Sequence, residues 1–156
     1  MGIIDNILTQ CTARIDGASG VTKAVRPLKN NEKLTIEDFT VIVRASDPDR
    51  LAAIDRAGNP PAIGWLLPIH VNCIVIPSKN NPDDYDKIWA DFTAVVQTAV
   101  TSVPDWWRFG GNCVNSELGP VTRLEPNEET PGGGRFVIAA QYRVDETNLN
   151  LSLIHI

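Results

Sequence analysis

Only two histidines, at positions 70 and 155, could serve as a general base in this sequence. His70 lies two residues before Asn72 in a stretch with strand-like alternation, and His155 lies within the last ten residues. Nucleophilic catalysis needs a serine or cysteine, a base, and a group that orients the base. The spacing brings no serine or cysteine to either histidine, and a histidine in a strand is more often structural than catalytic. We therefore expect no catalytic residue.

The three cysteines could hold zinc or form a disulfide only if the fold brought them together. Cys11, Cys73 and Cys113 are far apart, and none belongs to the closely spaced pair of a zinc or redox motif. We expect three buried free thiols in a reducing compartment. With so few histidines as well, we expect no metal site and no cofactor.

Two acidic stretches and one glycine-rich stretch have simpler interpretations than a ligand site. Asp83, Asp84 and Asp86 lack the alternating ligands and central glycine of a calcium loop, and they suit the first turn of a helix. The sequence SDPDR at 46–50 is typical of a solvated turn, with a magnesium ligand as the alternative. The glycines at 132–134 precede a strand, whereas a phosphate-binding loop leads into a helix and carries a Lys-Ser/Thr pair.

The overall composition is that of a folded, acidic, globular chain. Its 156 residues are 43% hydrophobic and 21% charged, with a formal net charge of −5 and a pI of about 4.9. This charge disfavours non-specific binding to DNA, RNA or an anionic membrane. We see no basic leader followed by an apolar stretch, and the most apolar segment is too short to span a bilayer. We expect one domain over 1–145 and a tail over 146–156.

Apolar periodicity predicts the elements that position these side chains. We expect helices over 3–15 and 81–103, strands over 38–46, 64–78, 120–124 and 135–144, a loop or loose hairpin over 16–37, a helical turn near 50–56 and a hairpin tip over 127–134. Helices on one face of a sheet satisfy this order. The predicted fold is α+β: a mainly antiparallel sheet of four or more strands, with a long helix and a short N-terminal helix packed on one face.

The helix over 81–103 has the clearest boundaries. Asn81 can cap it, Pro82 suits its first position, and its apolar stripe is expected to be core. In the strand over 64–78, Pro68 lacks a backbone donor. We therefore expect Pro68 at the strand start, at a bulge or on an edge of the sheet.

Two segments outside the regular elements are candidates for contacts with other molecules. The connection over 46–63 contains Asp47 and Arg50, and long connections in compact domains tend to be functional. The tail over 146–156 alternates polar and apolar residues. It either pairs with a neighbouring subunit's sheet edge or has no fixed structure.

A third candidate is the segment in which Trp106 and Trp107 precede Arg108. One of two adjacent tryptophans usually points inward while the other is partly exposed. An exposed tryptophan beside an arginine is a common interface anchor. The alternative is that both tryptophans pack under the helix end.

The order of these segments and their residue patterns resemble those of the tail terminator proteins of long-tailed bacteriophages, the lambda-type minor tail protein family. After a short N-terminal helix, that family has a strand like DFTVIVRAS, a long strand like HVNCIVIPS, and an acidic helix start with spaced aromatics like PDDYDKIWADFTAVV. A glycine-bearing segment and a last strand like FVIAAQYRV close the pattern. The resemblance covers residues 3–145, and the segment over 16–37 and the tail depart from it.

The resemblance implies a structural virion protein and not an enzyme. Assembled in the host cytoplasm, such a chain forms a ring, a hexamer in that family, which caps the tail tube. The ring contacts the tube protein and a head-completion or connector protein, and an acidic lumen lets DNA pass without binding it. On this hypothesis Asp47, Arg50, Trp106, Trp107 and Arg108 contribute to the contacts between subunits.

Two other functions fit the same sequence. The first is another head–tail connector or neck protein of a phage. The second is a small-ligand enzyme or binding module that uses the loops over 46–63 and 104–112. Light scattering separates these classes, because a ring or concentration-dependent oligomer favours assembly and a strict monomer favours ligand binding.

Overall fold

The computed structural model describes residues 2–27, 36–126 and 131–145, so the predicted tail and the tip residues 127–130 lie outside the described residues. The elements, in chain order, are α1 (Ile3–Asp16), β1 (Lys23–Val25), β2 (Thr40–Ala45), β3 (Asp49–Arg50), η1 (Ala52–Ile54), β4 (Ala62–Ile74), η2 (Pro77–Lys79), η3 (Pro82–Asp84), α2 (Tyr85–Thr101), η4 (Trp106–Arg108), β5 (Asn115–Leu118), β6 (Thr122–Leu124) and β7 (Gly133–Asp145), where η marks a 3₁₀ turn.

The seven described strands form one sheet in the order β1-β2-β4-β7-β5, with β3 paired to β4 and β6 paired to β7. The 13-residue strands β4 and β7 pair antiparallel along their whole length, from Ala62 opposite Asp145 to Ile74 opposite Gly133. The pair β1–β2 is parallel. The predicted α+β class is therefore confirmed, but the sheet is mixed, and β1 lies in a segment predicted as a loop or hairpin.

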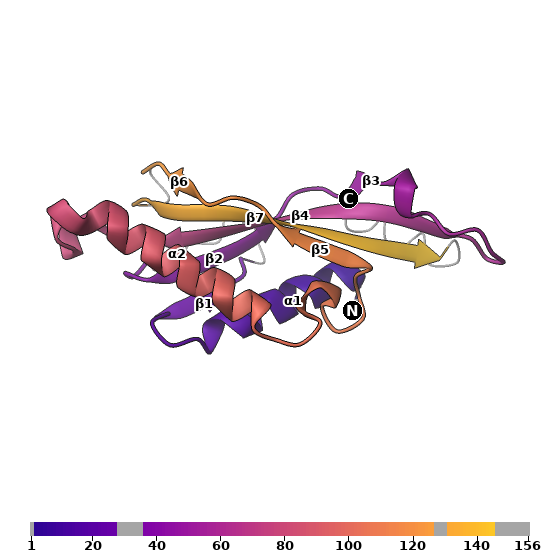
Figure 1. The fold of residues 1–156 in the computed structure, drawn as a ribbon, viewed down its shortest axis with the longest axis horizontal. Coiled ribbons are helices and arrows are strands. Elements are labelled where there is room, and N and C mark those ends of the chain that lie inside the picture. Colours follow the sequence, from indigo (N-terminus) through magenta and orange to yellow (C-terminus); the bar gives the residue numbers. More distant parts are fainter. Residues whose placement is uncertain (1, 28–35, 127–130, 146–156) are drawn as a thin grey trace.

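Both helices cover the same face of the sheet (Figure 1). Alternate side chains of β2, β4 and β7 point to that face, because neighbouring residues of a strand point to opposite sides. The buried set there includes Ile7, Cys11 and Ile15 of α1, Phe92, Val96 and Val100 of α2, Val41 and Val43 of β2, Ile69 and Val71 of β4, and Phe136 and Ile138 of β7. This apolar layer is the core.

One end of the sheet extends past the helices (Figure 1). It consists of β3, η1 and the outer halves of β4 and β7, and we call residues 49–66 and 141–145 the arm. Strand β3 continues the line of β2 along β4. The helical turn predicted near 50–56 is η1, whereas β3 was not predicted.

Helix α2 begins as predicted. The Asn81 side chain accepts a hydrogen bond from the N–H of Asp83 at 3.1 Å, and Pro82 opens the 3₁₀ turn that runs into the helix. The prediction that the whole apolar stripe is core is wrong for Val95 and Val103, which are 40% and 39% exposed. Val95 lies beside the line of contact with the sheet, and Val103 follows the end of the helix.

Pro68 stands in the middle of the central strand β4, opposite Ala139 in an uninterrupted register, and not at a strand start, a bulge or a sheet edge as predicted. Its carbonyl accepts a hydrogen bond from the N–H of Ser46 at 3.0 Å, so its backbone groups face β2. Because β2 ends at Ala45, the donor that proline lacks would face the break between β2 and β3. The missing hydrogen bond therefore falls where the neighbouring strand is already interrupted.

Candidate functional site

The segment that carries the two tryptophans is a tight turn with an unusual backbone. η4 lies between Asp105, with φ of 53°, and Phe109, with φ of 44°, and two glycines with positive φ follow. A left-handed residue other than glycine costs about 1–2 kcal/mol, so surrounding contacts must hold it. Phe109 has such contacts, because its side chain is fully buried in the core.

Arg14 of α1 fixes this turn. Its Nη1 donates to the carbonyls of Trp106 at 3.0 Å and of Val100 at 3.3 Å. Its guanidinium carbon lies 4.4 Å from the centroid of the Phe109 ring, a cation–π contact. Burial lowers the pKa of Arg14 from its ordinary value, although a guanidinium remains charged. Arg14 therefore joins α1, the end of α2 and the tryptophan turn.

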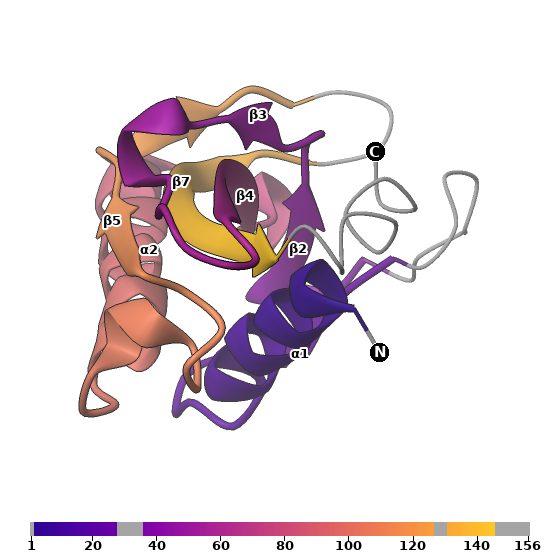
Figure 2. The ribbon, with the colours of Figure 1, turned by 90° about the vertical axis from the view of Figure 1, so that its right-hand side faces the viewer.

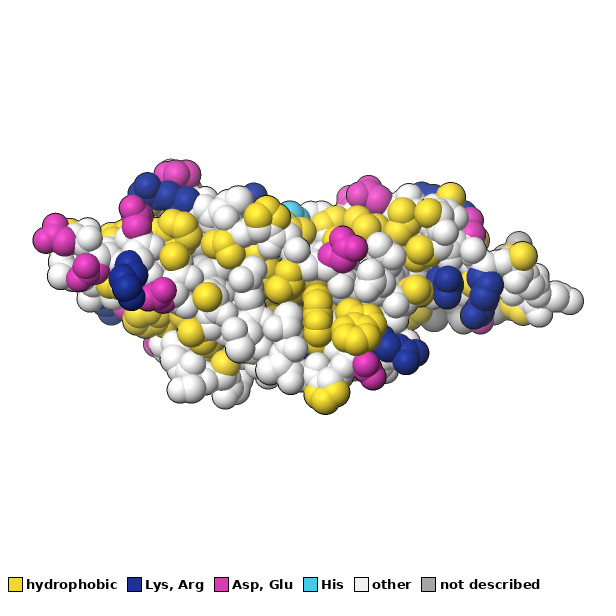
Figure 3. Space-filling view, in the orientation of Figure 1, with side chains coloured by type: hydrophobic (Ala, Val, Ile, Leu, Met, Phe, Trp, Pro, Cys, Tyr) yellow, Lys and Arg dark blue, Asp and Glu magenta, His cyan; other side chains and the backbone are white. Residues whose placement is uncertain are grey.

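The two tryptophans of the turn differ in burial. Trp106 is half-buried and packs edge-on against Phe109, with ring centroids 6.4 Å apart. Trp107 is 38% exposed and Arg108 is exposed, which agrees with the first of the two alternatives left open by the sequence, one tryptophan packed inward and one partly exposed. The Trp107 carbonyl accepts a hydrogen bond from the Ser116 hydroxyl of β5 at 2.8 Å. Hydrophobic side chains reach the surface over this turn and β5 (Figure 3).

Arg50 has an internal role in the arm. Its Nη1 and Nη2 each donate to a carboxylate oxygen of Asp55 at 2.6 Å, and Nη1 also donates to the Gly64 carbonyl at 3.0 Å. The hydrogen bond from Arg50, and then the one from the Gly64 N–H, lower the pKa of Asp55 to about 2. Arg143 Nε donates to the Ile54 carbonyl at 2.6 Å. Arg50 thus braces the arm, and its predicted role in subunit contacts stays a prediction.

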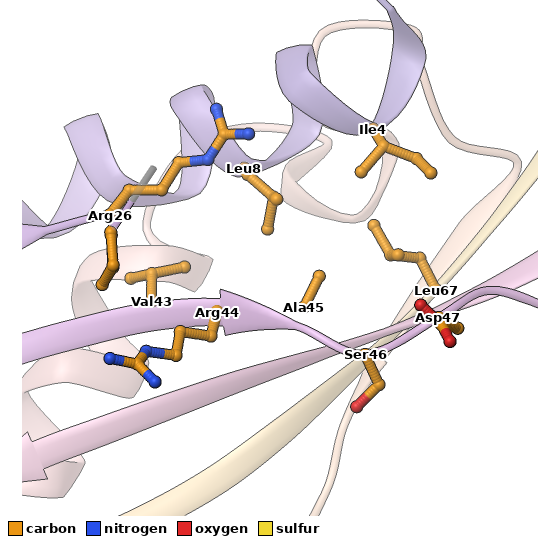
Figure 4. A pocket seen from close by; sticks show the side chains of 10 residues that line it. Ile4, Leu8, Arg26, Val43, Arg44, Ala45, Ser46, Asp47 and Leu67 are labelled. Carbon is orange, nitrogen blue, oxygen red and sulfur yellow. The ribbon is translucent and has the colours of Figure 1, made fainter. Parts of the chain in front are cut away.

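Asp47 lines a cavity of about 250 Å³ between α1 and β2 (Figure 4). Arg26 lines it on the side of α1, where its Nη1 donates to the Asp5 carboxylate at 2.5 Å. Apolar side chains converge in it from three elements: Ile4 and Leu8 of α1, Val43 and Ala45 of β2, and Leu67 of β4. The cavity therefore combines these apolar side chains with the Asp47 carboxylate, the Ser46 hydroxyl and two guanidinium groups, those of Arg26 and Arg44, and its lining is more polar than apolar.

The structure does not bring the two predicted groups of residues together. Asp47 and Arg50 follow β2, whereas η4 packs against β5, and β2 and β5 lie on opposite sides of the central pair β4–β7. Figure 2 shows the tryptophan turn next to β5, with β2 on the far side of β7 and β4. We call residues 106–108 the tryptophan surface, and Asp47 with its cavity the Asp47 surface.

The reactive side chains of the described residues are dispersed. His70 contacts the Ser46 hydroxyl, a neighbour that the sequence spacing did not imply. Ser46 also lines the cavity, with its side chain directed away from α1 in Figure 4, and no described carboxylate hydrogen-bonds to His70. Burial, and then the charge of Arg135, lower the pKa of His70. The three cysteines are buried free thiols, as predicted, and burial raises the pKa of each to about 12. Within the described ranges, no three His, Cys, Asp or Glu side chains group as metal ligands.

Three parts of these surfaces were missed in the sequence. Arg14 stands in the predicted N-terminal helix, and no pattern distinguishes it from other polar residues there. Asp55 follows Arg50 by five residues, a spacing that matches neither a helix nor a strand neighbour. The cavity combines side chains from separate segments, so no local signal marks it.

No protein-family model matches this chain, and no curated protein matches it. In the part of the chain that the structure describes, no helix has the length and apolar character needed to cross a membrane. The class of the protein, α+β with a mixed sheet, therefore comes from the structure, and a function has to be argued from the two surfaces.

Proposed function

We propose that this chain is a structural subunit of a phage tail, which assembles with copies of itself into a ring that caps the tail tube, as tail terminator proteins do. The order α1, β2, β4, α2, β7 supports this, because it follows the segment order on which the sequence resembles that family. The ring would join the tube protein to the head-completion or connector protein, and the resemblance implies six copies.

The observation that carries the proposal is the placement of two surfaces on opposite sides of one sheet. A closed ring of more than two copies needs heterologous contacts, in which each subunit uses two different patches. The tryptophan surface and the Asp47 surface are two such patches, whereas a single self-complementary patch would give a twofold dimer. Open sheet edges lie on the same two sides: β1 and β3 on one, β5 and β6 on the other.

The net charge supports the same proposal. A tail conduit must pass DNA without holding it, and an acidic wall repels the phosphate backbone. The formal charge of −5 per chain is multiplied in a ring. In this proposal DNA passes through the lumen and no residue binds it specifically.

The test is the mass and shape of the purified protein. Light scattering after size-exclusion chromatography should give several times the 17.1 kDa of one chain, six times for a hexamer, and electron microscopy should show rings with a central hole. Added to assembling tube protein of the same phage, the ring should stop elongation, which a neck protein would not do. A monomer at every concentration contradicts the proposal. Substrate conversion by that monomer, lost in Ser46→Ala or His70→Ala, would instead establish the enzyme alternative.

A further inference from the structure

The cavity beside Asp47 has the size and chemistry of a socket for one aromatic side chain. Its volume of about 250 Å³ exceeds the roughly 150 Å³ of a protein cavity that binds benzene. Ile4, Leu8 and Leu67, which are almost fully buried, give it an apolar floor, Arg44 and Ser46 add polar groups, and the Asp47 carboxylate can accept a hydrogen bond. Arg26 adds a cation that can lie against a ring. An amphipathic ring with an N–H donor matches this lining better than an aliphatic side chain does.

Backbone groups of β2 are open beside this cavity. Strand β1 pairs with β2 only as far as Ile42. The N–H of Ser46 points to β4, as its hydrogen bond to the Pro68 carbonyl shows, and successive residues alternate, so the N–H and C=O of Ala45 point away from β4. No described strand lies on that side of Ala45. A loop that enters the cavity can therefore also hydrogen-bond to this edge.

The tryptophan surface offers the matching group. Among the large hydrophobic side chains of the described residues, five are exposed, and Trp107 is the biggest of them, the other four being valines. Phe109 anchors the turn in the core, and the hydrogen bond from Ser116 holds the Trp107 backbone. A side chain on so rigid a support loses little conformational freedom when it is bound. Tryptophans of this kind are enriched among binding hot spots.

We propose that Trp107 of one copy inserts into the Asp47 cavity of the next copy, with its indole Nε1–H directed to the Asp47 carboxylate. The cavity lies beside β2 and the tryptophan surface beside β5, on opposite sides of the central pair β4–β7, so a chain cannot fill its own cavity. Arg108, next to Trp107, can pair with the Asp47 carboxylate, which shares the cavity with Arg44 and with Arg26, the latter already paired with Asp5. We call the Trp107 side chain the knob and the Asp47 cavity the socket. Because each molecule has both, the same contact can repeat around a ring. This inference rests on the proposed ring and names the groups that join its subunits.

The test uses one variant of each half of the contact. Trp107→Ala removes the knob and keeps the socket, whereas Ala45→Phe keeps the knob and fills the socket. We expect each variant to self-associate about 30-fold more weakly, or still less, as replacement of a hot spot does. A mixture of the two retains one intact pair of surfaces. It should therefore form a heterodimer of twice 17.1 kDa that grows no further.

Two further variants separate docking from folding. Asp47→Arg changes an exposed residue of the socket, so it should leave the circular dichroism spectrum and Tm near those of the wild type while weakening assembly. Adding Arg108→Asp in the same chain should restore part of that loss, because the charges are exchanged. Val95→Ala alters a valine of α2 that is 40% exposed, and this control should assemble like the wild type.

The possible outcomes distinguish failure of the Trp107 contact from failure of the proposed ring. If Trp107→Ala and Asp47→Arg both assemble like the wild type, the docking is refuted and the ring proposal stands. If the wild-type chain stays monomeric, the ring itself is refuted. If the wild type stops at a dimer, the repeating contact of Trp107 with the next copy is refuted.

Discussion

Gly134 of β7 is the point where α2 rests directly on the sheet. A Cβ atom added at Gly134 would lie 2.1 Å from Thr93 Oγ1 and 2.9 Å from Trp89 Cε3, both on α2. Real Cβ atoms do not make contacts this short, so the helix would have to move. Gly134→Ala therefore tests how closely α2 is packed on β7.

We expect Gly134→Ala to lower the free energy of unfolding by about 1–3 kcal/mol, the usual effect of extra volume in a packed core. For a chain of this length, each kcal/mol lowers Tm by about 2–4 °C. Urea unfolding followed by circular dichroism measures the change. The midpoint should fall while the slope m stays the same, because the surface exposed on unfolding hardly changes.

A second variant identifies the contact. Thr93→Ala removes the nearest atom, although it also loses the hydrogen bond from the Thr93 hydroxyl to the Trp89 carbonyl at 2.7 Å. In a double-mutant cycle, Thr93→Ala should cost less in the Gly134→Ala background than in the wild type, with a coupling of about 0.5–3 kcal/mol. Gly17→Ala is the matched control, because a Cβ there meets nothing within 4 Å. Wild-type stability of Gly134→Ala would show that α2 does not pack this closely on β7.

Three further predictions concern the core, the thiols and the arm. Phe109→Ala should lower the free energy of unfolding by about 3–5 kcal/mol in urea titrations, because it empties a fully buried site. The three cysteines should resist a thiol reagent until the protein unfolds. Burial raises the pKa of each thiol from 9.0 to about 12, so the stability that the three thiols contribute is present below pH 9. Alkaline unfolding curves should show that this stability is lost between pH 9 and about pH 12. The pKa of Asp55 is lowered to about 2, so the contribution of Asp55 to folding stability is present above pH 3.8 and is lost as the pH falls toward 2. NMR titration of the Asp55 carboxyl should give a midpoint of about 2, and Arg50→Ala should move this midpoint toward 3.8.

The long elements could be predicted from the sequence because their apolar periodicity extends over many residues. Helices α1 and α2 and strands β2, β4 and β7 all have this signal, and the structure has them close to the predicted ranges. Strands β1, β3 and β5 have three, two and four residues, too few for an alternating pattern to stand out. Their partner strands hold them in place, so the parallel pairing of β1 with β2 could not be predicted.

The two surfaces show the same limit. The sequence leaves open whether one or both tryptophans pack inward, and the tertiary structure decides it, with Trp106 half-buried and Trp107 38% exposed. Arg50 shows what sequence alone misses, since its guanidinium binds Asp55 only because the chain turns back through η1. The cavity beside Asp47 is lined by side chains of α1, β2 and β4, and only tertiary packing brings these three elements together.

The backbone of the tryptophan turn supports docking at Trp107 independently of the resemblance to tail terminators. Asp105 and Phe109 are both left-handed at about 1–2 kcal/mol each, whereas glycine would adopt this conformation without that penalty. Core packing holds Phe109 in this conformation, whereas Asp105 is exposed and has no such packing, and a turn that keeps an indole in one position binds with less loss of entropy. Asp105→Gly tests this argument: the free energy of unfolding should stay the same or rise by up to about 1 kcal/mol, while self-association becomes weaker. Equal or tighter assembly of Asp105→Gly would show that the strain serves no purpose in docking.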